Sequence, residues 1–438
     1  MRRFVIILGS VCCIIASSLQ AAIYGGGSGT ADDPYQIWTP EQLNTIGLNE
    51  VDLDKCFVLM DDIDMSAYTG TQYNIIGRRV KPAFSGLFDG NGHVIRNLSY
   101  TKTNYNPVDY VRAGLFGTVS NSGRVCNLGL ENVMFSCGQV LTVGGLAGEN
   151  LGQISSCWVT GSVSGVADSI GGLVGSDFGR IIHCYADCTV SGSASVNNFV
   201  NVGGLIGYAQ YGVRDCFAAG SAGSAYKYAR VGGLVGDNAG SLLACYATAS
   251  VSSSGQYARV GGLVGNSGML GSITFCYAAG PVSGTYYTGG LAGAGSSTSV
   301  TACFWDVQTS GTMDGIGSLN PDPAGVIGLD TASMKMLSTF ASAGWDFTNE
   351  TANGTNNYWR MCTDDVDYPR LNWEAGLGDF ACPDGVNAED LDYYLAHWQM
   401  ANCTPTNNYC GGADMDTSGR VDLADFAMFA AHWLEGME

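Results

Sequence analysis

The stretch GGLVGDNAGSLLACYATASVSSSG, residues 232–255, is one copy of a unit that recurs through the middle of the chain. Its opening phrase is Gly-Gly-Leu, followed by Ala, Val or Ile and then another Gly. The phrase begins at positions 144, 171, 203, 232, 261 and 289, so successive copies start 27 to 32 residues apart. A degenerate copy, Ala113–Gly117, stands 31 residues before the first. A period of this size is typical of a solenoid, in which each unit forms one coil of the backbone.

Each unit contains three short apolar runs separated by turn residues. The first is the Gly-Gly-Leu phrase, the second is an aliphatic residue followed by Cys and an aromatic residue, as in Leu242–Tyr246, and the third is a small-residue run such as Gly280–Gly284. Runs of this length bounded by Gly, Asn and Ser predict strands, and residues 113–303 show no sustained helical period. We therefore predict an all-β fold, a right-handed parallel β-helix with three strands per coil.

A cysteine recurs at the same point of six units. These residues are Cys157, Cys184, Cys216, Cys245, Cys276 and Cys303. Stacked coils would align them in an inward column, which could form disulfides or hold a row of metal ions. No His or carboxylate recurs beside them to complete a metal site. We interpret the column as buried free thiols that pack as small hydrophobic groups.

The consensus GGLVGxNxGxIxxCYAxGxVxG resembles the GLUG motif, which occurs in tandem in bacterial secreted and surface proteins. The resemblance covers residues 113–303 and implies a β-helical stalk or binding surface, without implying a reaction. Residues 23–112 resemble the leader of such arrays and should cap the open end of the solenoid. A short helix is expected there from Thr39 to about Leu48, because Thr39 and Pro40 suit a helix start.

The segment after the repeats, residues 304–375, is expected to cap the far end. A short helix is predicted over Thr331–Leu337. Five residues are expected to pack over the end of the solenoid, and these are Trp345, Trp359, Tyr368, Pro369 and Leu371.

The net charge limits the partners that the protein can have, and the N-terminal sequence indicates its location. The formal net charge is −20, and residues 376–438 hold eleven acidic residues and one Arg, which argues against nucleic acid and anionic membranes as partners. Met1–Arg3, the apolar run Phe4–Ala16 and the small residues up to Ala22 predict a secretory signal peptide. No other stretch is apolar and long enough to span a membrane. We expect a secreted protein, free or attached to the cell surface.

Export permits disulfides. The candidates outside the repeated column are Cys362, Cys382, Cys403 and Cys410, and their pairing is open. A bond from Cys382 to Cys403 or Cys410 is one arrangement that would staple the tail.

The acidic tail contains the spacing of a calcium loop. In Asp414–Asp425 oxygen-bearing side chains fall at positions 1, 3, 5, 9 and 12, Gly stands at 6, and position 7 offers its carbonyl. An apolar helix, Phe426–Trp433, follows. We predict Ca2+ as the bound ion. Its ligand residues would be Asp414, Asp416, Ser418, Arg420, Asp422 and Asp425.

This loop and helix resemble half of a dockerin, a small module with two calcium loops. The other half would be the loop Asp379–Asp390 and the helix Leu391–Trp398, although Ala381 and Pro383 stand where oxygen ligands should be and Gly385 is displaced by one. We expect this first loop to bind calcium poorly. The resemblance implies a cohesin-like protein or a cell-surface component as partner. It places the specificity positions at Leu423 and Ala424, and we interpret His397 and His432 as packing or capping residues.

An aromatic row precedes several Gly-Gly-Leu phrases. Its members are Phe199, Tyr228, Tyr257 and Tyr286, and Arg230 and Arg259 stand two positions before two of the phrases. Aromatic rings can lie under the faces of sugars, so the row could bind carbohydrate. Stacking that only stiffens the sheet is the other interpretation.

These features predict a secreted, non-catalytic β-solenoid for adhesion or polysaccharide binding, tethered through a calcium-dependent dockerin-like domain. The alternative is a polysaccharide-degrading β-helix enzyme, a lyase or O-glycosyl hydrolase, in a cellulosome-like system. Such enzymes need carboxylates gathered on one exposed strand, whereas the six acidic residues between Gly144 and Cys303 are scattered. No catalytic residue is predicted. The predicted parts are a signal peptide at 1–22, an N-terminal cap at 23–112, the GLUG-repeat solenoid at 113–303, a C-terminal cap at 304–375 and the dockerin-like domain at 376–438.

Overall fold

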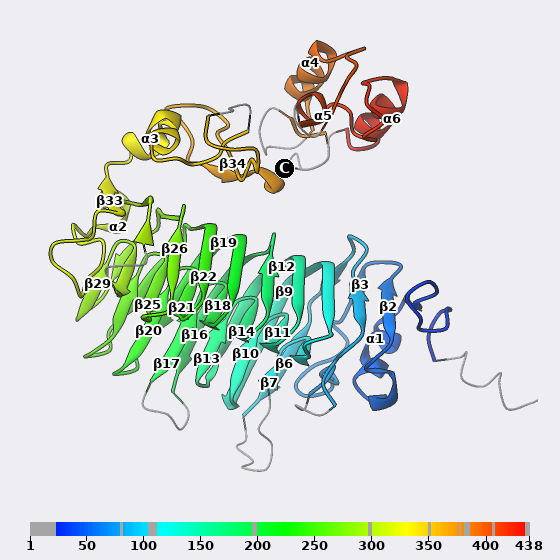
Figure 1. Cartoon of the computed structure of the whole chain (residues 1–438). Helices are drawn as coiled ribbons and strands as arrows, with labels where there is room; N and C mark the ends of the chain where they lie inside the picture. Colours follow the sequence, from blue (N-terminus) through cyan, green and yellow to red (C-terminus); the bar gives the residue numbers. More distant parts are fainter. Residues whose placement is uncertain are drawn as a thin grey trace, which may run out of the picture.

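A parallel β-solenoid forms most of the chain in the computed structural model (Figure 1). The structure describes residues 23–78, 82–103, 112–194, 199–296, 300–348, 352–375, 378–380, 386–404 and 408–433. The expected signal peptide, Cys382 and the first-loop residues Ala381, Pro383 and Gly385 lie outside these ranges. The predicted β-helix and its repeats are confirmed.

Three parallel sheets run along the solenoid, and we name them A, B and C. Sheet C consists of β7 (Arg112–Ala113), β10 (Thr142–Gly144), β13 (Ser169–Gly171), β17 (Val200–Gly203), β20 (Ala229–Gly232), β24 (Arg259–Gly261) and β29 (Tyr287–Gly289). Sheet B consists of β8 (Phe116–Val119), β11 (Ala147–Asn150), β14 (Val174–Asp177), β18 (Ile206–Ala209), β21 (Val235–Asn238), β25 (Val264–Ser267) and β30 (Ala292–Ala294).

Sheet A has 19 strands, because the N-terminal segment and the last coil also belong to it. Its strands are β1 (Tyr35–Ile37), β2 (Cys56–Leu59), β3 (Ile63–Asp64), β4 (Leu87–Asp89), β5 (Val94–Arg96), β6 (Ser99–Lys102), β9 (Arg124–Gln139), β12 (Gln153–Val166), β15 (Arg180–Ile182), β16 (Tyr185–Ser193), β19 (Gly212–Ser224), β22 (Ser241–Ala247), β23 (Ser250–Ser253), β26 (Ser272–Thr274), β27 (Tyr277–Ala278), β28 (Val282–Ser283), β31 (Val300–Thr301), β32 (Cys303–Asp306) and β33 (Val326–Leu329).

The strands do not coincide with the three predicted runs. The first Gly of each phrase ends a strand of sheet C, and the second Gly and the Leu form the corner to sheet B, as Gly233 and Leu234 do between β20 and β21. The second and third runs both lie in sheet A, and in β12 and β19 they form one continuous strand. The prediction of three sheets is therefore confirmed, but the predicted positions of the strands are wrong. Glycine has no Cβ atom and lets the chain turn at a point where the apolar neighbours suggested a strand.

The glycine columns bring sheets B and C into direct backbone contact. A Cβ atom on Gly232 would lie 2.0 Å from the carbonyl oxygen of Val235, and one on Gly233 would lie 2.0 Å from the carbonyl oxygen of Gly262. A Cβ atom on Gly236 would lie 2.6 Å from the backbone nitrogen of Val202, and one on the equivalent Gly265 would lie 2.5 Å from that of Val231. The same contacts recur in neighbouring coils, so a side chain at the Gly232 or Gly236 column would push the two sheets apart, and one at the Gly233 column would push successive coils apart.

We predict that Gly233→Ala destabilises the solenoid by about 1–3 kcal/mol or more, because overpacking against backbone cannot be relieved by a rotamer change. The matched control is Gly212→Ala, where a Cβ atom would meet nothing within 4 Å. Thermal unfolding followed by circular dichroism measures both. Equal melting temperatures for the two variants would contradict this account of the glycine columns.

The cysteine column is buried and its thiols are free, as expected. The residue before each cysteine has a left-handed backbone with φ of 48–53°. Each thiol donates to the carbonyl oxygen two residues earlier at 3.1–3.3 Å, as Cys216 Sγ does to Arg214. Burial raises the pKa of Cys157, Cys216 and Cys276 well above the usual value, which keeps these thiols protonated as donors. The column therefore also holds a bend in sheet A, a role that the sequence analysis missed.

A second internal column lies at the end of the sheet B strands. Asn150, Asp177, Ala209, Asn238 and Ser267 stack in register along it. Asn150 Nδ2 donates to Asp177 Oδ1 at 2.7 Å. Burial raises the pKa of the Asp177 carboxyl to about 7. Asp177 is thus an acid in a position that amides occupy in other coils.

The raised pKa of Asp177 makes stability depend on pH. Between about pH 4 and pH 7 the unfolded chain releases this proton while the folded chain keeps it, so the free energy of unfolding falls as pH rises through that window. We predict that Asp177→Asn removes this dependence and stabilises the protein by on the order of 2–4 kcal/mol at pH 8. Thermal unfolding at pH 4.5 and pH 8 tests this. A stabilisation of the same size at both pH values would contradict it.

The N-terminal segment extends the solenoid rather than only covering it. α1 (Pro40–Ile46) begins where predicted, with the Thr39 side chain accepting from Gln42 N, and η2 (Glu50–Asp52) follows. β2 then pairs in register with β4, and β4 pairs in register with β9. Asp89 accepts a hydrogen bond from Asn91 N within a turn, whereas Asp62 accepts from Val94 N at the start of β5 and forms an ion pair with Arg96.

The first part of the C-terminal segment covers the end of the solenoid, where β33 pairs with β32, but the rest packs on the side of the solenoid and so corrects the expectation of a pure end cap. Its elements are α2 (Val307–Ser310), η3 (Ser333–Lys335), α3 (Leu337–Ser342), β34 (Trp359–Arg360), β35 (Arg370–Leu371) and η4 (Asn372–Glu374). Trp345 Nε1 donates to Ala302 O at 2.9 Å, Tyr277 Oη to Pro369 O at 2.7 Å and Trp373 Nε1 to Asp215 O at 2.9 Å. Figure 1 shows α3 and β34 above the starts of the sheet A strands.

The C-terminal segment packs on the side of the solenoid because a stacked aromatic ladder lies on the outer face of sheet A. Tyr185, Phe217, Tyr246 and Tyr277 follow one another at centroid distances of 4.7–5.0 Å, with ring planes nearly parallel. The Trp and Tyr residues expected at the end of the solenoid bury this ladder instead. The helix predicted over Thr331–Leu337 is present only as the single turn η3, and the longer helix α3 begins at Leu337, whose N–H donates to Asp364 Oδ1.

Candidate functional site

The predicted aromatic row forms the wall of an open groove. Each ring stands immediately before a strand of sheet C, and parallel pairing in register places one ring on each of four successive coils. The exposed fractions are 37 % for Phe199, 41 % for Tyr228, 39 % for Tyr257 and 48 % for Tyr286. The structure therefore brings together all four predicted residues and leaves their rings open to solvent.

Ring geometry defines the groove along the solenoid axis. Tyr228 and Tyr257 stack with centroids 5.4 Å apart and planes inclined by 14°, whereas Tyr257 and Tyr286 meet edge to face at 5.6 Å. The groove has a volume of about 650 Å³. Its lining residues are Phe199, Tyr228, Ala229, Arg230, Tyr257, Arg259, Tyr286 and Tyr287.

Three cations accompany the rings. Lys227 Nζ lies 5.0 Å from the Tyr228 centroid and 5.1 Å from the Tyr257 centroid, and the Arg230 guanidinium lies 4.4 Å from the Phe199 centroid. Arg230 also forms an ion pair with Asp237 from sheet B. Arg259 Nη1 donates to Asn266 Oδ1 at 2.5 Å. Sheet B thus orients both arginines from behind the groove.

A second groove of about 770 Å³ lies beside the ends of the sheet A strands, and sequence reasoning missed it. Nearly all its lining residues are Ser and Gly, from the third run of each unit. Ser224 Oγ donates to Gly192 O at 2.7 Å and Ser253 Oγ to Ser224 O at 2.6 Å, so these hydroxyls join neighbouring coils.

The tail folds as two related halves. α4 (Ala388–Ala396) and α6 (Leu423–Ala431) begin with matching capping boxes, at Asn387 and Asp422. The short turn α5 (Asn408–Gly411) lies between them. Asp390 Oδ2 accepts from Asn387 N in the first half, and Asp425 Oδ2 accepts from Asp422 N in the second. Two helices with equivalent starts are thus present where the sequence analysis expected a paired module.

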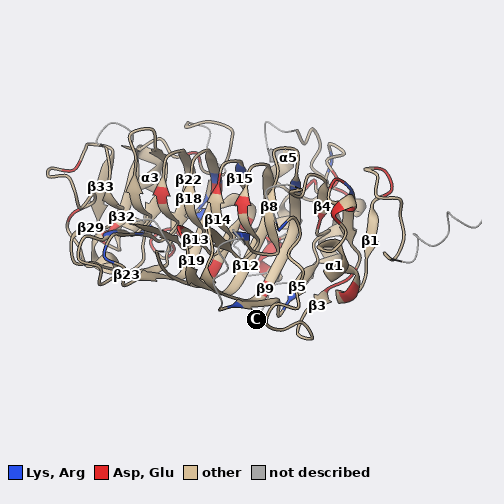
Figure 2. Cartoon of the chain, turned by 90° about the horizontal axis from the view of Figure 1, so that it is seen from below, with Lys and Arg blue, Asp and Glu red and all other residues tan. Residues whose placement is uncertain are grey.

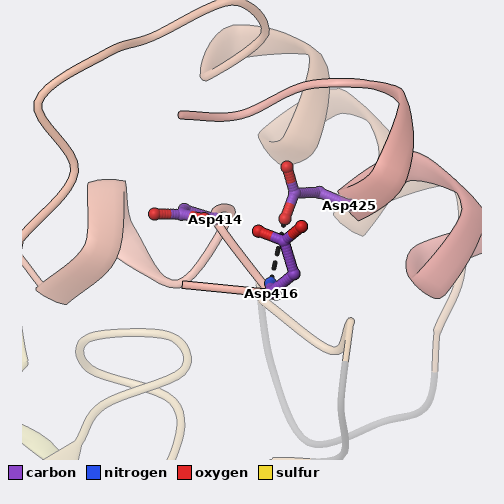
Figure 3. Close-up of side chains that lie close together, drawn as sticks. All are labelled: Asp414, Asp416 and Asp425. Atoms are coloured by element: carbon purple, nitrogen blue, oxygen red, sulfur yellow. Dashed lines mark hydrogen bonds between the residues drawn. The ribbon is translucent and has the colours of Figure 1, made fainter. Parts of the chain in front are cut away.

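Three predicted metal ligands converge in the second half. Oxygens of Asp414, Asp416 and Asp425 lie within 4.8 Å of one another, and Figure 3 shows the side chains of Asp416 and Asp425 next to each other with Asp414 to one side. Asp416 N donates to Asp425 Oδ1 at 3.0 Å. Asp414 and Asp425 are buried, and hydrogen bonds from Ser418 lower the pKa of Asp416, which keeps that carboxyl ionised. This hard, anionic oxygen donor set fits a calcium ion.

The other three predicted ligands are placed differently. Ser418 Oγ donates to Arg420 O at 3.3 Å, which puts this hydroxyl beside the carbonyl expected to coordinate. Asp422 accepts from Ala424 N and caps α6, so its side chain is not part of the carboxylate cluster. Leu423 is 72 % exposed and Ala424 is exposed beside it. His397 Nδ1 lies 2.9 Å from Tyr393 O at the end of α4, consistent with capping.

The first half of the tail contacts a positively charged side chain, Arg360, from the C-terminal segment. Arg360 in β34 donates to Phe380 O at 2.7 Å and to Asp379 O at 3.4 Å. Arg360 is nearly buried, and the carboxylates of Asp379 and Asp390 act electrostatically on its guanidinium. A guanidinium thus faces the loop that lacks oxygen ligands in the sequence, and sequence reasoning gave no signal of this contact.

One predicted disulfide arrangement is wrong. Cys403 and Cys410 are bonded to each other, with their Cα atoms 4.9 Å apart, so neither can pair with Cys382. Cys362 is disulfide-bonded as well. Across the described ranges, we find no helix whose length and hydropathy would let it cross a membrane.

Comparison with known proteins gives partial likenesses. No family model matches the chain. The chain is 32 % identical over 150 residues, a third of its length, to halomucin of Haloquadratum walsbyi, and 30 % identical over 167 residues to a protein described as a Gly-rich membrane protein of Evansella cellulosilytica. It spans only 2 % and 18 % of the lengths of these relatives.

A solved structure supports the fold. A candidate immunoglobulin A1 protease from Bacteroides ovatus superposes with a TM-score of 0.55, covering 80 % of this chain and 96 % of that chain. Sequence identity is 22 %, so the likeness concerns the fold alone.

Proposed function

We propose that the protein is a secreted, non-catalytic β-solenoid that binds polysaccharide along its aromatic groove. The observation that carries this proposal is the exposure of four rings in a row, one on each coil. The other ladder of the same solenoid, with Tyr246 and Tyr277, is covered by the C-terminal segment. A row that served only to stiffen the sheet would have no reason to remain open, whereas sugar faces stack on exposed rings.

A binding role suits the groove better than the enzymatic alternative. A glycoside hydrolase uses a pair of carboxylates beside the sugar, but the groove lining contains no Asp or Glu. Within the described ranges, the one cluster of three or more His, Cys, Asp or Glu side chains with donor atoms within 4.8 Å lies in the tail. We therefore retain adhesion as the proposed role, and the likeness to halomucin is compatible with a surface location.

The tail would tether the solenoid. The carboxylate cluster supports a single calcium site, and the paired helices support the resemblance to a dockerin. Leu423 and Ala424 present an exposed apolar start of α6, which suits docking to a cohesin-like protein or a cell-surface component. The GLUG resemblance agrees with a surface role for the repeats.

Affinity electrophoresis of the full chain against a panel of soluble polysaccharides tests the binding proposal. Tyr257→Ala should weaken binding about tenfold, because the loss of one ring contact of about 1.4 kcal/mol corresponds to that factor in affinity. The control is Tyr211→Ala, a 57 % exposed residue outside the groove lining. Equal loss in both variants, or no retardation by any polysaccharide, would refute the proposal.

Calorimetric titration with calcium tests the tether. The full chain, freed of metal with a chelator, should bind one calcium ion, and Asp414→Ala should abolish binding because it removes a buried ligand. Asp392→Ala, at an exposed residue of α4, should leave binding unchanged. Two sites would show that the first loop also binds calcium, and no binding would refute the calcium proposal.

A further inference from the structure

We propose that the aromatic groove selects an anionic polysaccharide, one that carries carboxylate groups on successive sugar residues, over a neutral one. This inference rests on the proposed polysaccharide-binding function and adds the chemical class of the glycan. It follows from where the few cations of the solenoid lie and from how the neighbouring acids are arranged.

Cations concentrate at this groove in a protein of the opposite charge. The chain has a formal net charge of −20, and only five basic residues occur between Gly144 and Cys303. Three of the five, Lys227, Arg230 and Arg259, line or contact the ring row. Figure 2 shows how few charged segments the rest of the solenoid carries. A polyanion would be repelled by most of the molecule and attracted here.

The two arginines lack a full complement of counter-charges. Arg230 and Arg259 are neighbours in register on sheet C, and the residues behind them, Asp237 and Asn266, are neighbours in register on sheet B. Asp237 neutralises Arg230 through an ion pair, but the next coil offers an amide in the same position, and Arg259 donates to it. Arg259 is therefore held in place without losing its charge.

Lys227 adds a second positive charge between two rings. Its ammonium lies 5.0 and 5.1 Å from the centroids of Tyr228 and Tyr257. One coil after another thus presents a ring with a cation beside it. A polymer with an acidic group on each sugar can place sugar faces on the rings and its carboxylates on Lys227 and Arg259 at the same time.

The test compares polygalacturonate with the same polymer after methyl esterification, which removes the charge and keeps the sugar backbone. The full chain at low ionic strength should bind the free acid at least tenfold more tightly than the ester, and salt should narrow this difference. Arg259→Gln should remove most of the preference by weakening the binding of the free acid. Arg180→Gln, a charge-matched change at an exposed residue outside the groove, should retain the preference.

The outcomes separate this inference from the function on which it rests. Equal affinity for acid and ester, with both lost in Tyr257→Ala, would overturn the anionic preference while the groove remained a glycan-binding site. A preference lost equally in Arg180→Gln and Arg259→Gln would also overturn it, because the effect would then reflect overall charge. No binding of either form would overturn it too, and no binding across the wider polysaccharide panel would overturn the proposed function as well.

Discussion

The contact between the backbones of sheets B and C determines the rest of this structure. Glycine columns at the corner allow the two sheets to touch with no side chain between them, and every coil must therefore turn at the same place. This fixes the register in which each coil stacks on the next, so that chemically similar residues form straight columns. The cysteine column, the internal column that contains Asp177, the aromatic ladder of sheet A and the exposed aromatic row are consequences of that register. One change of residue type within a column, such as Asp177 among amides, then alters the chemistry at a defined position.

Sequence alone predicted the architecture, the cysteine column and the exposed aromatic row, but not the division into strands or the internal column that contains Asp177. Periodicity identified the parallel β-helix because every unit repeats the same residues. It did not show that Gly233 and Leu234 form a corner, since Leu234 and Val235 look like part of a strand when read linearly and are buried in either arrangement. The C-terminal segment was misplaced for a related reason. Its Trp and Tyr residues indicated packing against the solenoid, but only the stacked rings of sheet A, which exist once the register is set, define the surface that receives them.

The candidate sites differ in how far the sequence could predict them. Loop spacing identified the tail carboxylates because metal ligands in one loop lie close in sequence. It could not separate Asp422, which caps α6, from Asp416, since both spacings are compatible with either role. The aromatic row was visible as a recurrence before each Gly-Gly-Leu phrase, yet its exposure depends on which face of the coil the C-terminal segment leaves uncovered. The pairing of Arg360 with the first loop joins residues from separate segments, and no local pattern indicates it.

The sideways packing of the C-terminal segment also sets the direction in which the solenoid can work. Trp373 contacts Asp215 near the start of β19, whereas the ring of Tyr228 follows the end of the same strand, and Arg360 joins the tail to the segment that contains Trp373. The contact of the C-terminal segment with the solenoid and the aromatic groove therefore lie at opposite edges of the coil. A molecule held through its tail would lie along its support like a strip rather than stand up from it as a stalk, with its full row of rings turned outward.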